Sequence, residues 1–218
     1  FAKVYGLTPD AEPAVWHGAT QPGSYLENVA IDASGKLDWF DRSHTENSRA
    51  VIAAADIPGF VAPATVDIAD FMLILNRNAN IIPAVSRLTK DQAAAYFMLG
   101  ETQGTSAGGK AEAGKFLRVP GTNPFFAYRH EWQANRLREL LDTCDLDVFV
   151  LNTGRVGGAD GDEQSRKITP AVSAAIVAAI AHGGIEWVTD PDFGYQVAAS
   201  VPGVDDGELL QPRLLYQR

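Results

Sequence analysis

Cysteine is almost absent from this sequence of 218 residues, in which Cys144 is the single example. One cysteine can form neither an internal disulfide nor a cysteine metal cluster, and this fits a reducing, cytoplasmic compartment. Cys144 follows a helix-like stretch, so we expect it to be a buried small hydrophobic residue rather than a nucleophile. The four histidines never lie three or four residues apart, which argues against a histidine zinc site.

Other absences narrow the function classes further. No apolar run approaches the roughly 18–20 residues of a membrane-spanning helix. Positive charge is in deficit: the net charge is −9 and the sequence pI is about 4.8, which argues against non-specific binding to nucleic acid or to an anionic membrane. A phosphate ligand stays possible, because a phosphate site needs only a few local donors.

Two catalytic signatures and an initiator methionine are missing as well. The chain has no Gly-x-x-x-x-Gly-Lys-Ser/Thr sequence, and therefore no P-loop of its own, and no Gly-x-Ser-x-Gly elbow. It begins at Phe1, and a charge at Lys3 does not fit a signal peptide. We therefore expect a piece of a longer protein, or a processed chain.

What is present is a globular composition, 46% hydrophobic and 21% charged, which can bury a sizeable core. Apolar runs at Phe71–Leu75 and Val148–Leu151 predict strands that are buried on both faces. Tyr25–Ile31 and Lys36–Phe40 predict the two arms of a hairpin. The chain is thus expected to mix α and β elements, in one large domain or two small ones.

Helix signals alternate with these strands. Thr89 is a suitable N-cap for a helix that ends near Gly100, and Pro170–Ala181 predicts a second helix. Phe125–Leu141 predicts an amphipathic helix. We expect Thr189–Gly207 to be rich in loops and Leu209–Leu215 to trail off from the fold.

The stretch Gly100–Gly114 is rich in glycine and small polar residues, and it offers little to pack. It is either a flexible surface loop or a mobile lid over a site, because long loops in compact domains are often functional. It is also the best candidate for a domain boundary. We interpret residues 100–122, which include this stretch, as a mobile lid rather than as a domain boundary.

Two groups of cations are candidates for ligand binding. In Thr45–Arg49 a guanidinium leaves a polar turn and enters the apolar run Ala50–Ala55. Its rigid fork of donors suits a carboxylate or a phosphate, so Arg49 either pairs with a nearby acid or binds an anionic ligand. Arg166 and Lys167 precede a predicted helix start, and they either balance the acidic loop before them or bind an anion together with the helix amides.

A series of motifs resembles one family, the ATP-dependent phosphoenolpyruvate carboxykinases, in order and near the family spacing. The motifs span nearly the whole chain: Ala2-Lys3, Ala11-Glu12-Pro13, Leu26-Glu27-Asn28-Val29, Thr45-Glu46-Asn47-Ser48-Arg49, Pro83-Ala84-Val85-Ser86-Arg87-Leu88-Thr89, Leu151-Asn152-Thr153-Gly154, Pro202-Gly203-Val204 and Leu210-Gln211-Pro212-Arg213. The resemblance implies an α/β (mixed α+β) fold, the C-terminal mononucleotide-binding domain of such an enzyme, with a mixed sheet and flanking helices. Residues 1–218 would form the C-terminal part of the catalytic domain.

The family converts oxaloacetate and ATP to phosphoenolpyruvate, ADP and CO2 in gluconeogenesis, with Mg2+ and Mn2+. The resemblance implies that the P-loop and the metal ligands lie upstream of Phe1, so no metal ligand is expected in this chain. The expected partners are the nucleotide, oxaloacetate or phosphoenolpyruvate, and the N-terminal part of the same protein, with no nucleic acid and no membrane. This chain alone is expected to be inactive.

The resemblance also implies roles for particular residues. Lys3 would face the phosphoryl group, Glu12 would contact the nucleotide, and Arg49 would bridge the transferring phosphate and the substrate. A second group would lie near the adenine, with serine in place of the family's threonine at its last position: Arg166, Lys167, Ile168 and Ser173.

The sequence departs from the family at three places. The lid segment differs, Leu75–Asn80 replaces Thr-Ala-Asp-Ala-Phe-Gly, and the Lys-Arg order is reversed at Arg166-Lys167. Lysine does not replace arginine at a stacked site. The alternatives are a diverged non-catalytic ATP-binding homologue, a kinase acting on another substrate, and a fragment in which only the fold survives.

Overall fold

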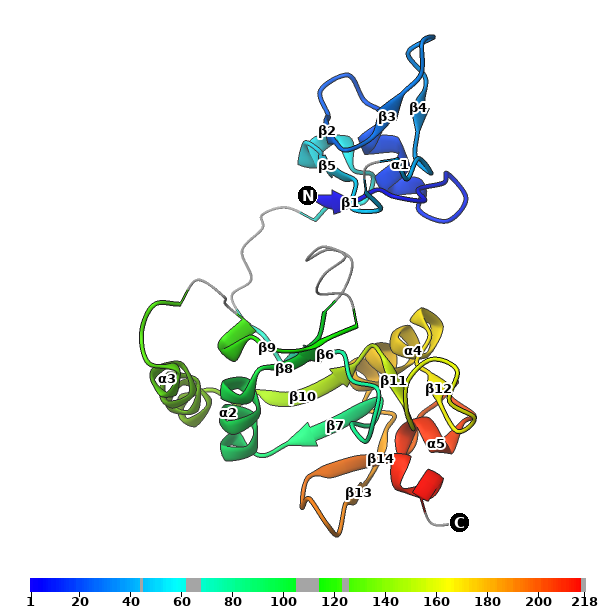
Figure 1. The fold of residues 1–218 in the computed structure, drawn as a ribbon. Coiled ribbons are helices and arrows are strands. Elements are labelled where there is room, and N and C mark those ends of the chain that lie inside the picture. Colours follow the sequence, from blue (N-terminus) through cyan, green and yellow to red (C-terminus); the bar gives the residue numbers. More distant parts are fainter. Residues whose placement is uncertain (44, 62–67, 105–113, 123–125, 217–218) are drawn as a thin grey trace. The chain divides into compact units, whose positions relative to one another are not determined.

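The structure is a computed structural model that describes residues 1–43, 45–61, 68–104, 114–122 and 126–216 (Figure 1). The chain divides into two compact units, which are described separately. Unit 1 comprises the described residues of Phe1–Asp67, and unit 2 comprises those of Ile68–Gly104 and Gly114–Arg218.

Unit 1 is a small antiparallel sheet with one short helix. Its strands follow the order β1-β5-β2, and a separate hairpin joins β3 to β4. Its core is a cluster of apolar residues that includes Val4, Leu7, Trp39, Ala50 and Ile52. The element bounds are β1 Ala2–Lys3, α1 Pro13–Ala19, β2 Tyr25–Glu27, β3 Ala30–Ile31, β4 Leu37–Asp38, β5 Arg49–Val51 and the 3-10 helix η1 Ala54–Asp56.

The predicted hairpin is confirmed between β3 and β4, but its first arm is shorter than expected. The predicted strand Tyr25–Ile31 is broken at Asn28, whose φ of 56° lies in the left-handed region. Asparagine tolerates this region better than most residues, because its short polar side chain can bond locally. β2 can therefore pair with β5 while β3 turns away to pair with β4.

Unit 2 is built on a five-stranded mixed sheet of order β13-β14-β7-β10-β6. β10 runs parallel to β6 and antiparallel to β7, so the expected mixed α/β class with a mixed sheet is confirmed. The sheet strands are β6 Phe71–Asn76, β7 Val85–Leu88, β10 Asp147–Asn152, β13 Glu186–Thr189 and β14 Gln196–Ser200. The remaining elements are α2 Lys90–Leu99, β8 Glu101–Gln103, β9 Phe116–Arg118, η3 Pro120–Thr122, α3 His130–Thr143, β11 Arg155–Val156, β12 Arg166–Lys167, α4 Pro170–His182, α5 Gly207–Leu210 and η4 Pro212–Tyr216.

Helices cover both faces of this sheet. On one face, Val148 and Val150 of β10 pack with α2 and α3; on the other, Phe149 and Leu151 pack with α4 and α5. The prediction that this strand is buried on both faces is confirmed. Side chains alternate across a strand, so a central strand between two helical layers needs an unbroken apolar run.

The same prediction is wrong for β6. This strand lies at the edge of the sheet formed by the described residues, and Leu75 is 62% exposed. A continuous apolar run indicates a strand, but it does not distinguish a central strand from one whose second face is only partly covered.

The C-terminal quarter holds more structure than the sequence predicted. The segment Thr189–Gly207, expected to be loop-rich, contains β14, which joins β13 to β7. Leu209, Leu210 and Leu215, expected to trail off, are buried in the core against α4. These segments are too short to show periodicity, and partners distant in sequence give them their structure.

Two smaller expectations about the third helix are corrected. α3 begins at His130 rather than at Phe125, which lies outside the described residues. Cys144, expected to be buried, is exposed just after the last residue of α3. No helix among the described residues is long and apolar enough to cross a membrane.

Candidate functional site

The turn before β5 fixes where Arg49 enters unit 1. The Thr45 hydroxyl accepts a hydrogen bond from the Asn47 amide at 3.0 Å, which closes the turn. Ser48 is 2% exposed, and its hydroxyl donates to the Asn28 carbonyl at 2.8 Å. Its own carbonyl accepts from the Val4 amide at 3.0 Å. Ser48 therefore bonds the chain to Asn28 and to Val4 immediately before Arg49.

The sheet register then brings two predicted site residues together. Lys3 of β1 lies directly opposite Arg49 of β5, so both side chains project from one face. Like charges in directly opposite positions destabilise a sheet. Arg49 makes no ion pair with any described residue, and its Nη1 atom is buried without a hydrogen-bond partner. Pairing with an acid of the described part of the chain does not explain Arg49, whereas an anion between the two cations would satisfy both.

Glu12 lies in the same unit, at the N-cap position of α1. It is exposed, and its side chain makes no capping hydrogen bond. Nothing in the packing of α1 therefore accounts for a glutamate at this position.

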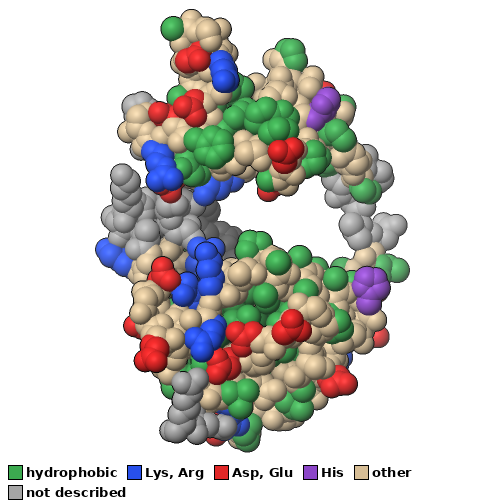
Figure 2. Space-filling model, turned by 90° about the vertical axis from the view of Figure 1, so that its right-hand side faces the viewer, with side chains coloured by type: hydrophobic (Ala, Val, Ile, Leu, Met, Phe, Trp, Pro, Cys, Tyr) green, Lys and Arg blue, Asp and Glu red, His purple; other side chains and the backbone are tan. Residues whose placement is uncertain are grey.

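Unit 2 contains a basic hollow of about 610 Å³ beyond the carboxyl end of β10. The side of unit 2 that carries α4 and β12 shows lysine and arginine side chains gathered together (Figure 2). Three cations and no carboxylate line the hollow, so its local charge is opposite to that of the whole chain. Its lining is Arg77, Gln103, Thr153, Gly154, Arg155, Lys167, Ile168, Pro170 and Ser173.

Asn152, the last residue of β10, organises the loops around this hollow. It is 0% exposed. Its Oδ1 accepts from the amides of Asn78 at 3.0 Å and Gly154 at 2.9 Å. Its Nδ2 donates to the carbonyls of Ile82 at 2.8 Å and Arg155 at 3.0 Å. One side chain thus holds the loop after β6 against the turn after β10.

Only glycine fits at position 154, two residues after Asn152. A Cβ on Gly154 would lie 2.3 Å from the Asn78 carbonyl oxygen, which is backbone and cannot swing aside. Thr153 donates its amide to the Asn76 carbonyl at 2.8 Å and its hydroxyl at 3.1 Å. The Asn76 side chain in turn donates to the Tyr96 hydroxyl at 2.5 Å, and burial raises the pKa of Tyr96. The Asn-Thr-Gly motif therefore allows the loop after β6 and the turn after β10 to pack closely.

Replacing Gly154 by alanine is expected to destabilise unit 2 by about 2 kcal/mol, because overpacking against backbone forces the two loops apart. Urea unfolding followed by circular dichroism measures this. Gly23→Ala is the matched control, since a Cβ at Gly23 meets nothing within 4 Å and its φ is not positive. Equal stability of the two variants would show that the loops tolerate the added methyl group.

Three of the residues predicted near an adenine line the basic hollow together: Lys167, Ile168 and Ser173. Thr169 caps α4 between them, accepting from the Val172 amide at 3.3 Å. Arg166 is not among the lining residues; its Nε lies 3.0 Å from Glu208. The two members of the basic pair thus diverge, because successive side chains of β12 point to opposite faces.

Comparison with known proteins identifies the family of this chain. The family profile described as "Phosphoenolpyruvate carboxykinase" matches residues 1–207. The chain belongs to the phosphoenolpyruvate carboxykinase family. It is 36% identical to "Phosphoenolpyruvate carboxykinase (ATP)" of Shouchella clausii, which it matches over 100% of its own length and 42% of the relative's. It is 36% identical to the protein of that name from Aeropyrum pernix, over 94% of this chain and 39% of the relative. It is 34% identical to the one from Oceanobacillus iheyensis, over 98% of this chain and 41% of the relative.

This phosphoenolpyruvate carboxykinase chain thus spans about two fifths of the length of the curated relatives that it matches. Among the residues described, no group of three or more histidine, cysteine, aspartate or glutamate side chains could hold a metal ion.

Sequence reasoning gave no role to Arg77, and it placed Arg155 only within a glycine-containing loop, Gly154–Gly158, that has the right place for a ligand after a buried strand. Arg77 was noted only as part of a departure from the family motif, and no described residue forms an ion pair with it. Arg155 also lines the hollow, but its guanidinium lies 2.9 Å from Asp160 and donates to Ser165 at 2.7 Å. Arg77 comes directly after β6, and Arg155 lies in the turn that follows β10. These positions were the available signal, because ligands of α/β sheets bind beyond the carboxyl ends of strands.

The predicted lid segment, residues 100–122, is described only at its base. β8 and β9 form an antiparallel hairpin, with Glu101 opposite Arg118, and residues 105–113 lie outside the described residues. Gly100 ends α2 with a φ of 56°, and a Cβ there would lie 2.4 Å from the Val119 backbone. Gln103 at this base also lines the basic hollow. The hairpin therefore begins at the edge of the candidate site.

Proposed function

We propose that this chain is the nucleotide-binding part of an ATP-dependent phosphoenolpyruvate carboxykinase. The observation that carries the proposal is the basic hollow, where Lys167, Ile168 and Ser173 meet at the start of α4. Its three cations and the positive end of the α4 dipole favour the phosphates of a nucleotide, and Ile168 and Pro170 belong to the apolar part of its lining. Arg166 would act indirectly, by fixing β12 through Glu208.

The reaction would be the decarboxylation of oxaloacetate to an enolate, followed by transfer of the γ-phosphoryl group of ATP. Phosphoryl transfer depends chiefly on positioning and charge neutralisation. Lys3 and Arg49 would supply that charge, with Glu12 contacting the nucleotide, and the lid segment would exclude water. Divalent metal would neutralise phosphate charge when bound, held by residues outside the described part of the chain.

A second candidate is a diverged homologue that binds ATP without decarboxylating oxaloacetate, or a kinase for another substrate. Its support is Arg77, a cation in the segment that departs from the family motif, which lines the basic hollow. An assay of the full-length protein for phosphoenolpyruvate formation from oxaloacetate, ATP and Mn2+ separates the two candidates. Turnover supports the carboxykinase; ATP binding without turnover supports the alternative.

Lys167→Ala is expected to weaken ATP binding by about tenfold, because a charged hydrogen bond to phosphate or base is lost. Isothermal titration calorimetry on the full-length protein measures the dissociation constant. Lys36→Ala, at an exposed turn of unit 1, removes the same charge and should leave ATP affinity within about twofold of wild type. Equal effects of the two substitutions would contradict the assignment of the basic hollow to the nucleotide.

A further inference from the structure

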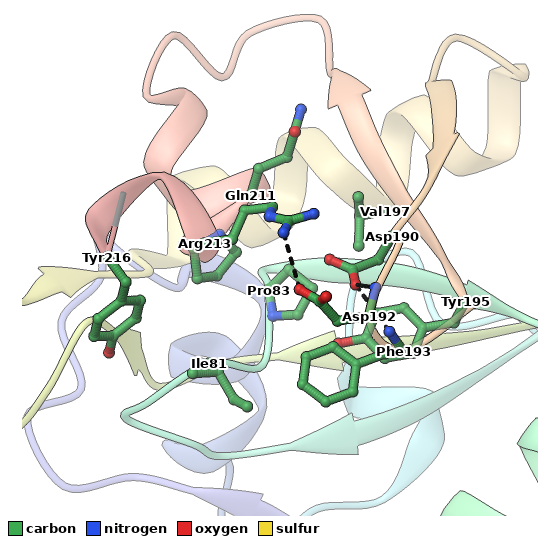
Figure 3. A pocket seen from close by; sticks show the side chains of 11 residues that line it. Ile81, Pro83, Asp190, Asp192, Phe193, Tyr195, Val197, Gln211, Arg213 and Tyr216 are labelled. Carbon is green, nitrogen blue, oxygen red and sulfur yellow. Dashed lines mark hydrogen bonds and ion pairs between the residues drawn. The ribbon is translucent and has the colours of Figure 1, made fainter. Parts of the chain in front are cut away.

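A second pocket of about 330 Å³ lies elsewhere in unit 2, between the β13–β14 turn and η4 (Figure 3). It shares no lining residue with the basic hollow, and the family-like motifs that contribute to its lining, at Pro83 and at Gln211–Arg213, carry no role in the sequence analysis. Ile81, Pro83 and Val197 supply much of its apolar wall. We call it the aromatic pocket, because the rings of Phe193 and Tyr195 form one of its sides.

The two rings form a flat platform. Phe193 and Tyr195 stack with centroids 5.6 Å apart and planes only 9° from parallel. Phe193 nevertheless is 54% exposed, so one of its faces remains uncovered by the protein. A large aromatic face left in water beside an apolar pocket favours a flat ring as its partner, since offset stacking adds to the gain from burial.

The turn that carries the platform is already fixed. Asp190 accepts from the amides of Asp192 at 2.9 Å and Phe193 at 3.0 Å. Its backbone amide donates to the Tyr195 carbonyl at 2.9 Å, and its carbonyl accepts from the Gly194 amide at 2.9 Å. The stacked rings therefore do not have to be ordered when a ligand arrives, which lowers the entropic cost of binding.

Arg213 supplies an incompletely used donor at the same pocket. Its Nη2 lies 2.9 Å from Asp192 Oδ2. Figure 3 marks this ion pair with a dashed line. Its Nε is buried without a hydrogen-bond partner. Unsatisfied buried donors are rare in proteins. The Arg213 side chain as a whole is 33% exposed, so a ligand acceptor can approach the part of its guanidinium that is not buried.

The charges that line the pocket set the charge of the ligand. Asp190, Asp192 and Arg213 are the charged residues of the lining, which is therefore negative by one charge. Burial, together with the Asp190 carboxylate, raises the pKa of Tyr195 to about 12, so its hydroxyl remains neutral at physiological pH. An anionic ligand would be repelled here, whereas an uncharged ligand with an acceptor group would not.

We propose that the aromatic pocket is a second small-molecule site, which binds a planar, uncharged aromatic compound bearing a carbonyl acceptor. The ring lies against Phe193, and the acceptor is directed to the Arg213 guanidinium. The pocket volume and its largely apolar wall with a few polar groups are typical of ligand sites. This inference is independent of the proposed nucleotide site.

Nicotinamide is a suitable probe, and its binding to the full-length protein can be followed by ligand-observed NMR. We expect a dissociation constant on the order of 1 mM, as for other fragments of this size. Benzoate has a similar shape but carries a negative charge, and cyclohexanecarboxamide keeps the amide but lacks a flat ring. Both are expected to bind at least about fivefold more weakly.

Variants locate the bound probe. Phe193→Ala is expected to weaken nicotinamide binding by about five- to tenfold, and Phe60→Ala, which removes another exposed phenylalanine, should not change it. Arg213→Lys keeps the charge but loses the planar fork, and should weaken binding by about fivefold. Lys167→Ala should leave nicotinamide binding unchanged.

Three results would overturn the proposal. One is no saturable nicotinamide binding by the full-length protein. Another is equal binding of all three probes, which would indicate non-specific adsorption. The last is loss of binding in Lys167→Ala but not in Phe193→Ala, which would assign the probe to the basic hollow. A thermal melt of Phe193→Ala that matches wild type excludes misfolding as the cause of weaker binding.

Discussion

Replacing Arg49 by lysine in the full-length protein is expected to lower kcat for phosphoenolpyruvate formation by about two orders of magnitude. Lysine retains the charge but not the planar fork that can bridge two oxygens. Loss of one aligned donor to a developing anion typically costs about 10²–10³ in rate. A coupled assay for phosphoenolpyruvate at saturating oxaloacetate and ATP measures kcat directly.

The stability of the same variant separates a catalytic role from a structural one. Arg49 forms no ion pair with a described residue and lies opposite Lys3, and its guanidinium lies 5.8 Å from the ring centroid of the exposed Phe1, a cation–π contact that lysine can also make, so the change to lysine costs little stability. The melting temperature of Arg49→Lys should therefore stay close to that of wild type. Arg42→Lys is the matched control: Arg42 is an exposed arginine of the same unit that pairs with Glu46 at 3.6 Å. It should change kcat by less than about twofold.

A large fall in melting temperature with unchanged kcat would assign Arg49 to the packing of unit 1 instead. Wild-type activity in Arg49→Lys would show that charge alone suffices at this position. Absence of turnover in the wild-type protein would contradict the proposed carboxykinase reaction itself, while leaving nucleotide binding by unit 2 to be judged from the Lys167 experiment.

Replacing Asn152 by alanine is expected to destabilise unit 2 by about 3–4 kcal/mol. The substitution removes all four of its side-chain hydrogen bonds at once. Two backbone amides and two backbone carbonyls of the surrounding loops then lose their hydrogen-bond partner in a buried environment, which costs stability. Urea unfolding measures the change, and hydrogen exchange at the amides of β10 shows whether the loss lies in unit 2.

Asn135→Ala on α3 is the control, because Asn135 is exposed and should cost less than about 0.5 kcal/mol. Asn152→Asp tests the bonding directly: aspartate keeps the acceptor for the Asn78 and Gly154 amides but loses both donors. It should be destabilised as well, since a carboxylate would face the Ile82 and Arg155 carbonyls. Wild-type stability of Asn152→Ala would show that water replaces the amide.

The sequence predicted only part of the basic hollow. Motif resemblance selected Lys167, Ile168 and Ser173, and these three residues line one hollow. It also selected Arg166, which pairs with Glu208 instead, because the alternation of β12 turns adjacent side chains apart. Asn152 belongs to a motif that assigns it no role, since its side-chain partners include loop residues that only the folded chain brings together.

The sequence by itself determined the family, the mixed α/β class, the buried run of β10 and the hairpin of unit 1. These depend on local periodicity, turn residues and short motifs, which are properties of neighbouring residues. Only the tertiary structure decided that Lys3 lies opposite Arg49, that β14 joins the sheet, and that Phe193, Tyr195 and Arg213 line one pocket. Strand register and the packing of distant loops are set by partners far along the chain, so a single sequence carries no local signal for them.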